Sequence, residues 1–305
     1  MPGPAQFTEQ DWECVLRSEA TCGESPMWST QEQVLYWTDN VGKRVHRLDP
    51  GTGRDQSFPV EQDVMDIVLG DGGRLLVVLA KSFAFVDPGS GVLDRFAEVE
   101  HDRPHNRFND GKLDRRGRYW AGSMNDRDWE QPTGALYRLG PEGEPELVLD
   151  DLVCSNGLGW SPDDKTFYLG ESFRHAVFGY DFDADSGSVS GKRVFARVDG
   201  EGGAFPDGLT VDADGGVWSV HNGAGRVVRY ASDGTITHTA TLPVPHPTSC
   251  IFGGPDLDTL YVTTARQGMD DQQLARHPLS GSVFALRPGL IGLPEPTFGE
   301  AKGAR

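Results

Sequence analysis

Four acidic or amide residues occupy similar local settings at widely separated positions, and their side chains could bind a metal ion. Asp207 lies between a proline and a glycine just before an apolar segment, which holds its carboxylate on a turn. Glu24, Asn109 and Asn156 stand in comparable places. Carboxylate and amide oxygens are ligands for hard divalent cations, and a carboxylate can also act as a general base. Asp and Asn before Gly also cap turns very often, so the chemistry depends on whether the fold brings these residues together.

A repeated pattern along the chain identifies that fold. Each copy has an aromatic or apolar strand, a short turn and a second strand, often followed by a hairpin turn such as Asp49–Gly53. The first strands are anchored, at successive spacings of 40 to 50 residues, by Tyr36, Leu76, Tyr119, Tyr168, Trp218 and Tyr261. Repeats of this length with several short strands and no helical period are typical of β-propeller blades.

The six copies predict an all-β fold, a six-bladed β-propeller with four-stranded antiparallel blades. A single blade leaves both of its faces apolar, and stacking the blades around a ring buries them. Residues 1–305 are expected to form one such domain, with about the first ten and the last ten residues loose. The segment Trp12–Leu16 precedes the first copy and is expected to complete the last blade, which would close the ring.

The polar residues recur at one place within the repeat. Glu24 and Asp207, for example, precede their strand anchors by 12 and 11 residues. Because equivalent positions in a pseudo-sixfold ring face the same axis, five side chains are expected to meet there: Glu24, Asn109, Asn156, Asp207 and Ser249. The second blade offers only Val64 or Met65. Two carboxylates held together repel each other unless a cation lies between them, so the spacing predicts a divalent metal site.

Composition narrows the range of functions. The formal net charge of −18 disfavours nucleic acid and anionic membranes as partners, since both bind clustered Lys and Arg. Neither an apolar run of roughly 18 residues, long enough to span a membrane, nor a leader peptide is visible, so a cytoplasmic protein is expected. The four cysteines lack C-x-x-C spacing and are expected to be free thiols. Nothing in the sequence indicates a protein partner.

Histidines form a rival set for a metal or for a general base. Among His175, His221 and His246, only His221 follows an aromatic strand closely enough to be expected near the axis. A lone histidine is more often a hydrogen-bonded structural residue, so the carboxylates and amides are the preferred site. The sequence contains neither a G-x-S-x-G nucleophile motif nor a P-loop.

An ordered set of motifs resembles one known family. The motifs are Gly23–Trp28 (GESPMW), Arg107–Lys112 (RFNDGK), Ser155–Asp163 (SNGLGWSPD), Phe205–Leu209 (FPDGL), Pro247–Asp256 (PTSCIFGGPD) and Leu260–Arg266 (LYVTTAR). Together they resemble the sugar-lactone lactonases, also called the gluconolactonase, regucalcin or senescence-marker-protein family. The resemblance covers nearly the whole chain, and it implies a six-bladed propeller with one divalent ion in its channel: Ca²⁺, Mg²⁺, Mn²⁺ or Zn²⁺.

The resemblance also implies which residues bind the metal. In the family the ligands are the Glu of G-E-x-P, the Asn of S-N-G and the Asp of P-D-G. These positions are Glu24, Asn156 and Asp207 in this chain. All three are among the five that the repeat spacing selects.

Substrate contacts follow from two further motifs. The Arg and Asn of R-x-N-D-G contact substrate in relatives, which points to Arg107 and Asn109. Some relatives carry a substrate-binding Glu shortly after an A-G-x-M segment. Here Asp126 could substitute for it, although a simple offset reaches Arg127.

The function implied is metal-dependent hydrolysis of a sugar-acid lactone to the open aldonic acid. Asp207 is the expected general base, and a small-molecule sugar lactone is the expected partner. Two alternatives stay open: a calcium-binding regulatory protein, and an organophosphate or aryl-ester hydrolase on the same scaffold. A lactone assay with and without chelator separates the first from an enzyme, and a substrate panel separates the second.

Overall fold

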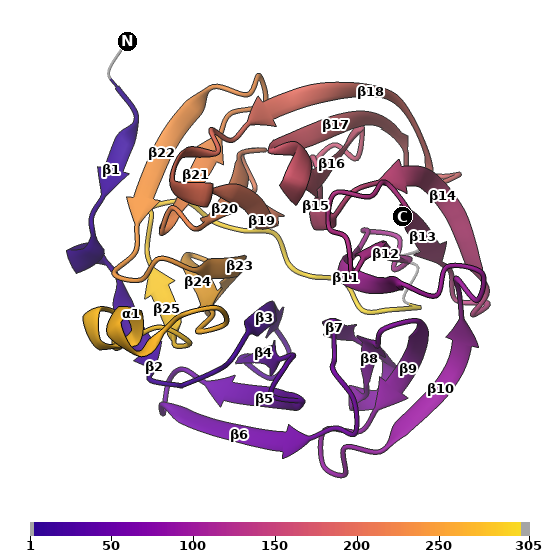
Figure 1. The fold of residues 1–305 in the computed structure, drawn as a ribbon, viewed down its shortest axis with the longest axis horizontal. Helices are drawn as coiled ribbons and strands as arrows, with labels where there is room; N and C mark the ends of the chain where they lie inside the picture. The colour runs from indigo at the N-terminus through magenta and orange to yellow at the C-terminus, as the bar shows by residue number, and fades with distance from the viewer. Residues whose placement is uncertain (1–2, 300–305) are drawn as a thin grey trace.

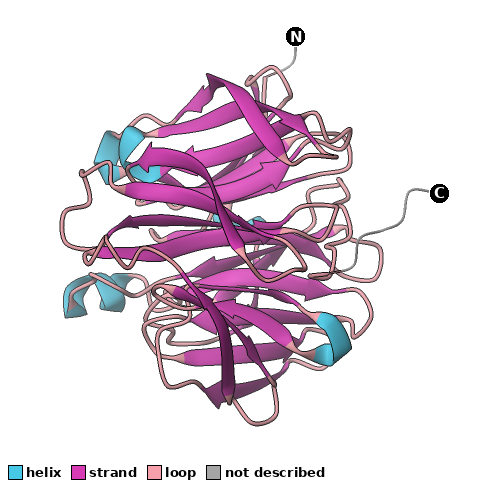
Figure 2. Ribbon diagram, turned by 90° about the vertical axis from the view of Figure 1, so that its right-hand side faces the viewer, coloured by secondary structure: helices cyan, strands magenta, loops and turns pink. Residues whose placement is uncertain are grey.

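The computed structural model describes residues 3–299, and Figure 1 shows six β-sheets arranged around a central axis. The predicted six-bladed propeller is therefore confirmed. Within each blade the strands follow one another outward from the axis, starting with β3, β7, β11, β15, β19 and β23. Figure 2 shows that strands make up almost all of the regular structure.

The first three blades each have four antiparallel strands. Blade one comprises β3 (Gly23–Ser29), β4 (Val34–Asp39), β5 (Arg44–Asp49) and β6 (Arg54–Pro59). Blade two comprises β7 (Asp66–Leu69), β8 (Leu75–Val78), β9 (Ser82–Val86) and β10 (Leu93–Glu98). Blade three comprises β11 (Asn106–Leu113), β12 (Tyr119–Asn125), β13 (Gly134–Leu139) and β14 (Pro145–Leu152).

The last three blades include the two strands from the start of the chain. Blade four comprises β15 (Ser155–Trp160), β16 (Thr166–Glu171), β17 (Ala176–Asp183) and β18 (Ser188–Arg197). Blade five comprises β19 (Phe205–Val211), β20 (Val217–Asn222), β21 (Arg226–Tyr230), β22 (Ile236–Thr241) and β1 (Ala5–Phe7). Blade six comprises β23 (Pro247–Gly253), β24 (Thr259–Thr264), β25 (Val283–Leu286) and β2 (Glu13–Leu16).

Helical structure is limited to short segments in the connections. Within residues 3–299 the four 3-10 turns are η1 (Glu9–Asp11), η2 (Asp71–Gly73), η3 (Ser172–Arg174) and η4 (Glu201–Gly203). The α-helix of the described chain is α1 (Asp271–Arg276), which Asp270 caps by accepting a hydrogen bond from the Gln273 amide at 2.8 Å. No helix in residues 3–299 is long and apolar enough to cross a membrane.

Burial explains which residues form which strand. The second strand of a blade is enclosed by neighbouring blades on both faces, so β4 reads as a nearly unbroken apolar run and is buried throughout. The outermost strand β6 is polar and largely exposed. Aromatic rings pack between adjacent blades, as in Phe83–Phe108, Trp120–Phe167, Phe195–Tyr230, Trp218–Phe252 and Trp28–Tyr261. Burial of each such ring contributes roughly 1.5–3 kcal/mol to stability.

The N-terminal segment closes the ring as predicted and adds a strand that was not predicted. Strand β2 pairs antiparallel with β25 and so completes blade six. Strand β1 pairs in parallel with β22, which gives blade five a fifth strand. The expectation of a loose start therefore fails for Ala5–Phe7, whose backbone hydrogen bonds extend an existing sheet edge.

The C-terminal segment, shown in yellow in Figure 1, runs across the ring after β25. Its backbone bonds to the far ends of several blades, with the amide of Phe298 donating to the Leu69 carbonyl at 2.8 Å. Phe298 is buried in the core. Residues 296–299, expected to be loose, are thus held in place, and residues 300–305 lie outside the described part. Because this segment packs against the ends of β11, β15 and β19, it covers one end of the channel.

Candidate metal and substrate site

The predicted site residues sit on irregularities in the innermost strands. Five of the six inner strands shift register against their neighbours at the polar positions, and only the inner strand of blade two pairs regularly. The shifts enclose Ser25–Pro26, Asn109–Asp110, Gly157, Asp207–Gly208 and Thr248–Ser249, and Glu24 and Asn156 are the last paired residues before theirs. A β-bulge turns side chains away from the regular pleat. Here the bulges direct polar groups toward the axis.

Glycine is required where two bulges press against each other. Gly157 has a positive φ of 38°, and a Cβ there would lie 2.5 Å from the Asp207 carbonyl oxygen. A Cβ on Gly208 would overlap the Ser249 side chain. The glycines of S-N-G and P-D-G therefore let the neighbouring blades approach closely enough to bring Asn156 and Asp207 together.

One cavity of about 560 Å³ opens at the end of the channel where the inner strands begin. All six residues predicted for the site line it: Glu24, Arg107, Asn109, Asp126, Asn156 and Asp207. Blade two contributes Met65, as the spacing suggested. Blade six contributes Thr248, whereas Ser249 faces a smaller space deeper in the channel. The placement predicted for Ser249 was therefore wrong by one residue, because a two-residue bulge sends successive side chains to different depths.

Asp207 is buried and held by two amides. Its Oδ1 accepts a hydrogen bond from Asn156 Nδ2 at 2.6 Å, and its Oδ2 accepts one from Asn222 Nδ2 at 2.9 Å. Asn156 also donates to the Ser172 hydroxyl at 3.1 Å. Burial raises the pKa of Asp207 to about 7, a rise that the Asn222 bond opposes and the charge of Asp110 adds to. A carboxylate with such a pKa can accept a proton near neutral pH.

The carboxylate of Glu24, like that of Asp207, is buried near other negative charges. Burial, followed by the negative charge of Asp207, raises the pKa of Glu24 well above its usual range. Neither carboxylate forms an ion pair with a Lys, Arg or His side chain of residues 3–299. Two buried carboxylates and an amide without a cationic partner fit a hard divalent ion, whose charge would remove their repulsion.

The predicted ligand set is poor in the residue types that usually mark a metal centre. In the described chain no group of three or more His, Cys, Asp or Glu side chains is arranged to hold a metal ion. The predicted set has two carboxylates, and its third member is the amide of Asn156. Oxygen ligands of this kind suit Ca²⁺, Mg²⁺ or Mn²⁺ better than thiolate-binding metals.

The side chain of Arg107 is fixed against the cavity wall. Its Nε donates to Asp126 Oδ1 at 2.6 Å, and its Nη1 donates to Asn109 Oδ1 at 2.8 Å. Asn109 in turn donates Nδ2 to the Ser155 carbonyl at 3.0 Å. Within residues 3–299, Arg107 Nη2 and Asp126 Oδ2 make no hydrogen bond. One donor group and one acceptor thus remain on this wall for a polar ligand. Asn109 also lines the cavity and holds Arg107, and its contact with substrate stays a prediction.

A second set of charges lies deeper along the axis. Asp66, Asp110 and Lys112 line a space of only about 20 Å³, together with bulge residues of blades one and six: Ser25, Pro26 and Ser249. Burial raises the pKa of Asp66 and of Asp110, and the positive charge of Lys112 acts in the opposite direction on Asp110. Lys112 Nζ lies 3.5 Å from Glu295 Oε1 of the C-terminal segment. The channel floor therefore contains a cationic side chain close to its carboxylates, whereas Arg107 in the cavity above pairs with Asp126 and not with Glu24 or Asp207.

Comparison with known proteins assigns this architecture to a family. The sequence model of the SMP-30/gluconolactonase/LRE-like region matches residues 22–266. The chain belongs to the SMP-30/gluconolactonase/LRE-like family. The matched range contains every predicted site residue, whereas β2 and the C-terminal segment fall outside it.

Individual relatives of this family member cover nearly its whole length. The 6-deoxy-6-sulfogluconolactonase of Pseudomonas putida is 38% identical over 93% of this chain and 97% of its own. Chicken (Gallus gallus) regucalcin is 36% identical over 94% of this chain and 97% of its own. Among solved structures, a calcium-binding regucalcin from Agrobacterium tumefaciens superposes with a TM-score of 0.90 at 27% identity, covering 96% of this chain and 99% of that one.

Three residues around the site of this family member were not among the preferred site residues, and of these only His246 was named, in the rival histidine set. Asn222 binds Asp207, and its Oδ1 lies 2.9 Å from His246 Nδ1. Ser172 binds Asn156. These residues come from the end of β20, a loop and η3, so counting along inner strands could not reach them. The sequence offered one indication of this role, since Asn222 closely follows the aromatic strand anchored by Trp218.

The histidine expected near the axis is not in the cavity. His221 is buried, with its Nδ1 3.3 Å from Arg226 Nε and its Nε2 3.2 Å from the Tyr230 hydroxyl. His246 lines the cavity instead. Side chains alternate along a strand, so the residue that faces the site at the end of β20 is Asn222 and not its neighbour.

Cysteines line the cavity without the properties of a nucleophile. All four cysteines are free, as expected, and Cys22 and Cys154 lie at the cavity wall. Burial raises the pKa of Cys154 to about 12 and that of Cys22 well above its usual value. Both side chains stay protonated at neutral pH, so they do not supply a thiolate.

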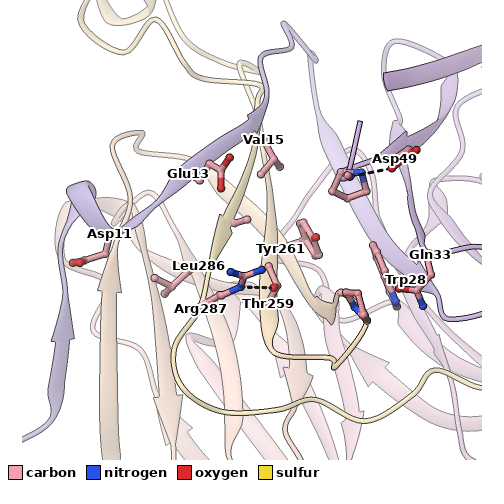
Figure 3. A pocket seen from close by; sticks show the side chains of 15 residues that line it. Asp11, Glu13, Val15, Trp28, Gln33, Asp49, Thr259, Tyr261, Leu286 and Arg287 are labelled. Carbon is pink, nitrogen blue, oxygen red and sulfur yellow. Dashed lines mark hydrogen bonds between the residues drawn. The ribbon is translucent and has the colours of Figure 1, made fainter. Parts of the chain in front are cut away.

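A separate cavity of about 480 Å³ lies at the opposite ends of the strands, between blades one and six (Figure 3). It is lined by the stacked rings of Trp28 and Tyr261 and by turn residues such as Asp49. Asp49 already accepts a hydrogen bond from the Gly51 amide at 2.9 Å. None of the predicted site residues reaches this cavity, so it has no part in the chemistry described above.

Proposed function

We propose that the protein is a metal-dependent lactonase that hydrolyses a sugar-acid lactone to the open aldonic acid. The main support is the convergence of Glu24, Asn156 and Asp207 at one cavity whose two carboxylates lack a cationic partner in the described chain. Family membership adds to this, since one relative is named as a 6-deoxy-6-sulfogluconolactonase and a solved structure named as a gluconolactonase has the same fold.

In this proposal Glu24, Asn156 and Asp207 hold one divalent ion. The ion, when bound, supplies Lewis-acid polarisation of the lactone carbonyl. Asn156 now donates a hydrogen bond to Asp207, and this bond is no longer needed once a cation neutralises the carboxylate. The side chain of Asn156 would then turn so that its oxygen, instead of its NH₂ group, faces the ion. This turn of the amide would give up the bond that Asn156 Oδ1 accepts from the Gly157 amide at 3.0 Å, and Ser172 would donate to the amide oxygen in place of its present bond to the Pro206 carbonyl at 2.9 Å.

Asp207 acts as general base in the proposed reaction. It removes a proton from the attacking water as the ring ester is cleaved, and a base of this kind typically contributes about 10²- to 10⁴-fold to the rate. Arg107 and Asp126 orient the sugar: Arg107 Nη2 donates to a hydroxyl or ester oxygen, and Asp126 Oδ2 accepts from a hydroxyl. Asn109 keeps the guanidinium in place.

The test is a pH-stat assay of aldonolactone hydrolysis, corrected for the spontaneous rate. Chelator-treated protein is compared with the same sample after addition of Ca²⁺, Mg²⁺, Mn²⁺ or Zn²⁺, and Asp207→Ala is compared with Asp185→Ala, which removes an exposed carboxylate. We expect activity only with metal, and only without the Asp207 change. Rates equal to the spontaneous rate with all four metals would refute the lactonase assignment.

The names of several relatives favour one second candidate, a calcium-binding protein without enzymatic activity. That function needs the metal ligands but makes no use of the wall formed by Arg107 and Asp126. Calcium binding without turnover of lactones, phosphotriesters or aryl esters would favour it. The cytoplasmic location remains a prediction.

A further inference from the structure

One tryptophan differs from all the others. Six of the seven are buried, with exposed fractions of 8% or less, whereas Trp129 is 52% exposed. It lies in the connection between β12 and β13 and lines the cavity that holds the predicted metal ligands. An indole left half in water at the wall of a cavity has apolar surface available for a ligand.

The ring of Trp129 is one end of an aromatic stack built by three blades. It stacks on Phe173 with centroids 5.5 Å apart and planes 19° apart. Phe173 packs on Phe205 at 5.8 Å. Phe173 belongs to η3 of blade four, and Phe205 begins β19 of blade five, two residues before Asp207. The stack thus forms one wall of the cavity beside the predicted metal ligands.

The loop that carries Trp129 is ordered by its own hydrogen bonds. Asn125 Oδ1 accepts from the amides of Arg127 and Asp128, both at 3.0 Å. The Asp128 carbonyl accepts from the Gln131 amide at 3.1 Å. Side-chain bonds of this kind fix a turn locally, so the indole is held in position before a ligand arrives.

Polar groups line other parts of the same cavity. Arg107 and Asp126 leave a donor and an acceptor for hydroxyl groups, as described above. A sugar lactone needs both kinds of surface, because its hydroxyls project from the ring while its C–H bonds form apolar patches on the ring faces. Those C–H groups carry slight positive charge and are attracted to the negative face of an aromatic ring.

We propose that Trp129, supported by Phe173 and Phe205, is a substrate subsite that stacks on the C–H face of the lactone ring. The proposal rests on the lactonase function and specifies how that site holds its substrate. The stack selects ligands with a cyclic, flat face, which the lactone has and the open-chain product lacks. The subsite therefore binds the substrate more tightly than the aldonic acid and helps the product to leave.

The kinetic test compares Trp129→Ala, Trp129→Leu and Trp129→Phe. We expect the Ala and Leu variants to raise KM about tenfold with kcat nearly unchanged, and the Phe variant to restore most of the loss, as stacking predicts. Leu147→Ala is the matched control, since Leu147 is 54% exposed on the outer strand of the same blade. An unchanged KM in Trp129→Ala, with wild-type activity intact, overturns the subsite and leaves the lactonase function standing.

Fluorescence quenching tests the contact between Trp129 and the ligand without requiring catalysis. Trp129 is the only tryptophan of the described chain exposed enough to be quenched readily by acrylamide. A lactam analogue of the sugar lactone should protect it from quenching, and the open aldonate should protect it much less. Equal protection by both, or none by the lactam, contradicts the proposal. If the wild-type protein hydrolyses no lactone, the lactonase function and this subsite fail together.

Discussion

Asn222 donates its side-chain amide to Oδ2 of Asp207 at 2.9 Å, across the paired strands β20 and β19. This bond lowers the pKa of Asp207 against the larger effect of burial. His246 lies 2.9 Å from the other end of the same amide and fixes its orientation. The carboxylate expected to bind metal is thus supported by residues outside the ligand set, as in many metal sites.

The first prediction concerns this support. Asn222→Ala removes the bond, so the pKa of Asp207 rises from its value of about 7 and a larger fraction of the carboxyl is protonated at neutral pH. We expect metal affinity at pH 7 to fall about tenfold and to recover partly at pH 8.5. Titration of metal-stripped protein with Mn²⁺ by calorimetry measures this. Equal affinities for the variant and the wild type would show that Asn222 does not tune the carboxylate.

The second prediction separates two roles of Asp207. Asp207→Asn keeps the shape and an oxygen ligand but cannot accept a proton. We expect turnover to fall by at least about 10²-fold while some metal binding remains, whereas Asp207→Ala should lose both. Lactone hydrolysis and Mn²⁺ titration on the same samples give the two readouts. Full activity of the Asn variant would rule out Asp207 as the base.

The third prediction concerns the cavity wall. Arg107→Ala removes the donor toward the ligand and leaves Asp126 without its partner, so KM should rise about tenfold or more with a smaller change in kcat. Arg107→Lys should rescue little, because a lysine cannot reproduce the two bonds that Nε and Nη1 make to Asp126 and Asn109. Steady-state kinetics measures both. A rescue by Lys would mean that charge alone matters there.

The fourth prediction concerns the channel floor. Lys112→Met removes the cation near Asp110 and Glu295, and this should destabilise the fold by about 3 kcal/mol, the usual cost of breaking a buried pair. Glu295→Gln should cost less, because Lys112 keeps Asp110 as a neighbour of opposite charge. Urea unfolding gives both values. If Glu295→Gln destabilised the fold more than Lys112→Met, Lys112 would stabilise mainly the C-terminal segment and not the channel floor.

Much of the fold and of the site could be predicted because the ring repeats. Glu24, Asn156 and Asp207 recur 11 or 12 residues before the anchors of their strands, and a pseudo-sixfold axis brings such positions to a single cavity. The same counting misplaced Ser249, since it cannot tell which of two bulge residues faces which depth. Asp126 lines the cavity as suggested, and its role there stays a prediction.

Other features depend on contacts that no repeat encodes. Asn222 and His246 reach Asp207 through a strand end and a loop, and Glu295 comes from a segment outside the blades. The parallel pairing of Ala5–Phe7 with β22 depends on an available sheet edge, which periodicity does not reveal. Each of these contacts joins residues by tertiary packing, so each needed the structure.

The last prediction uses His221 to separate acid stability from the metal site. Burial, followed by the charge of Arg226, lowers the pKa of His221 to about 3. The unfolded chain takes up a proton on this histidine near pH 6.5, while the folded protein does not until about pH 3. Stability is therefore lost as the pH falls through this window, by up to about 1.4 kcal/mol per pH unit.

His221→Gln should remove that contribution, so the variant loses less stability than the wild type between pH 6.5 and pH 4.5. The raised pKa values of Glu24 and Asp207 act in the opposite direction in metal-free protein, where stability falls as the pH rises toward 7. They act equally in both proteins and cancel in the difference. Urea midpoints of metal-free wild type and variant at pH 6.5 and pH 4.5 measure this difference. His101→Gln is the control, since the His101 side chain is 75% exposed. Equal pH slopes for wild type and His221→Gln would mean that His221 is charged in the folded state, which its contact with Arg226 opposes.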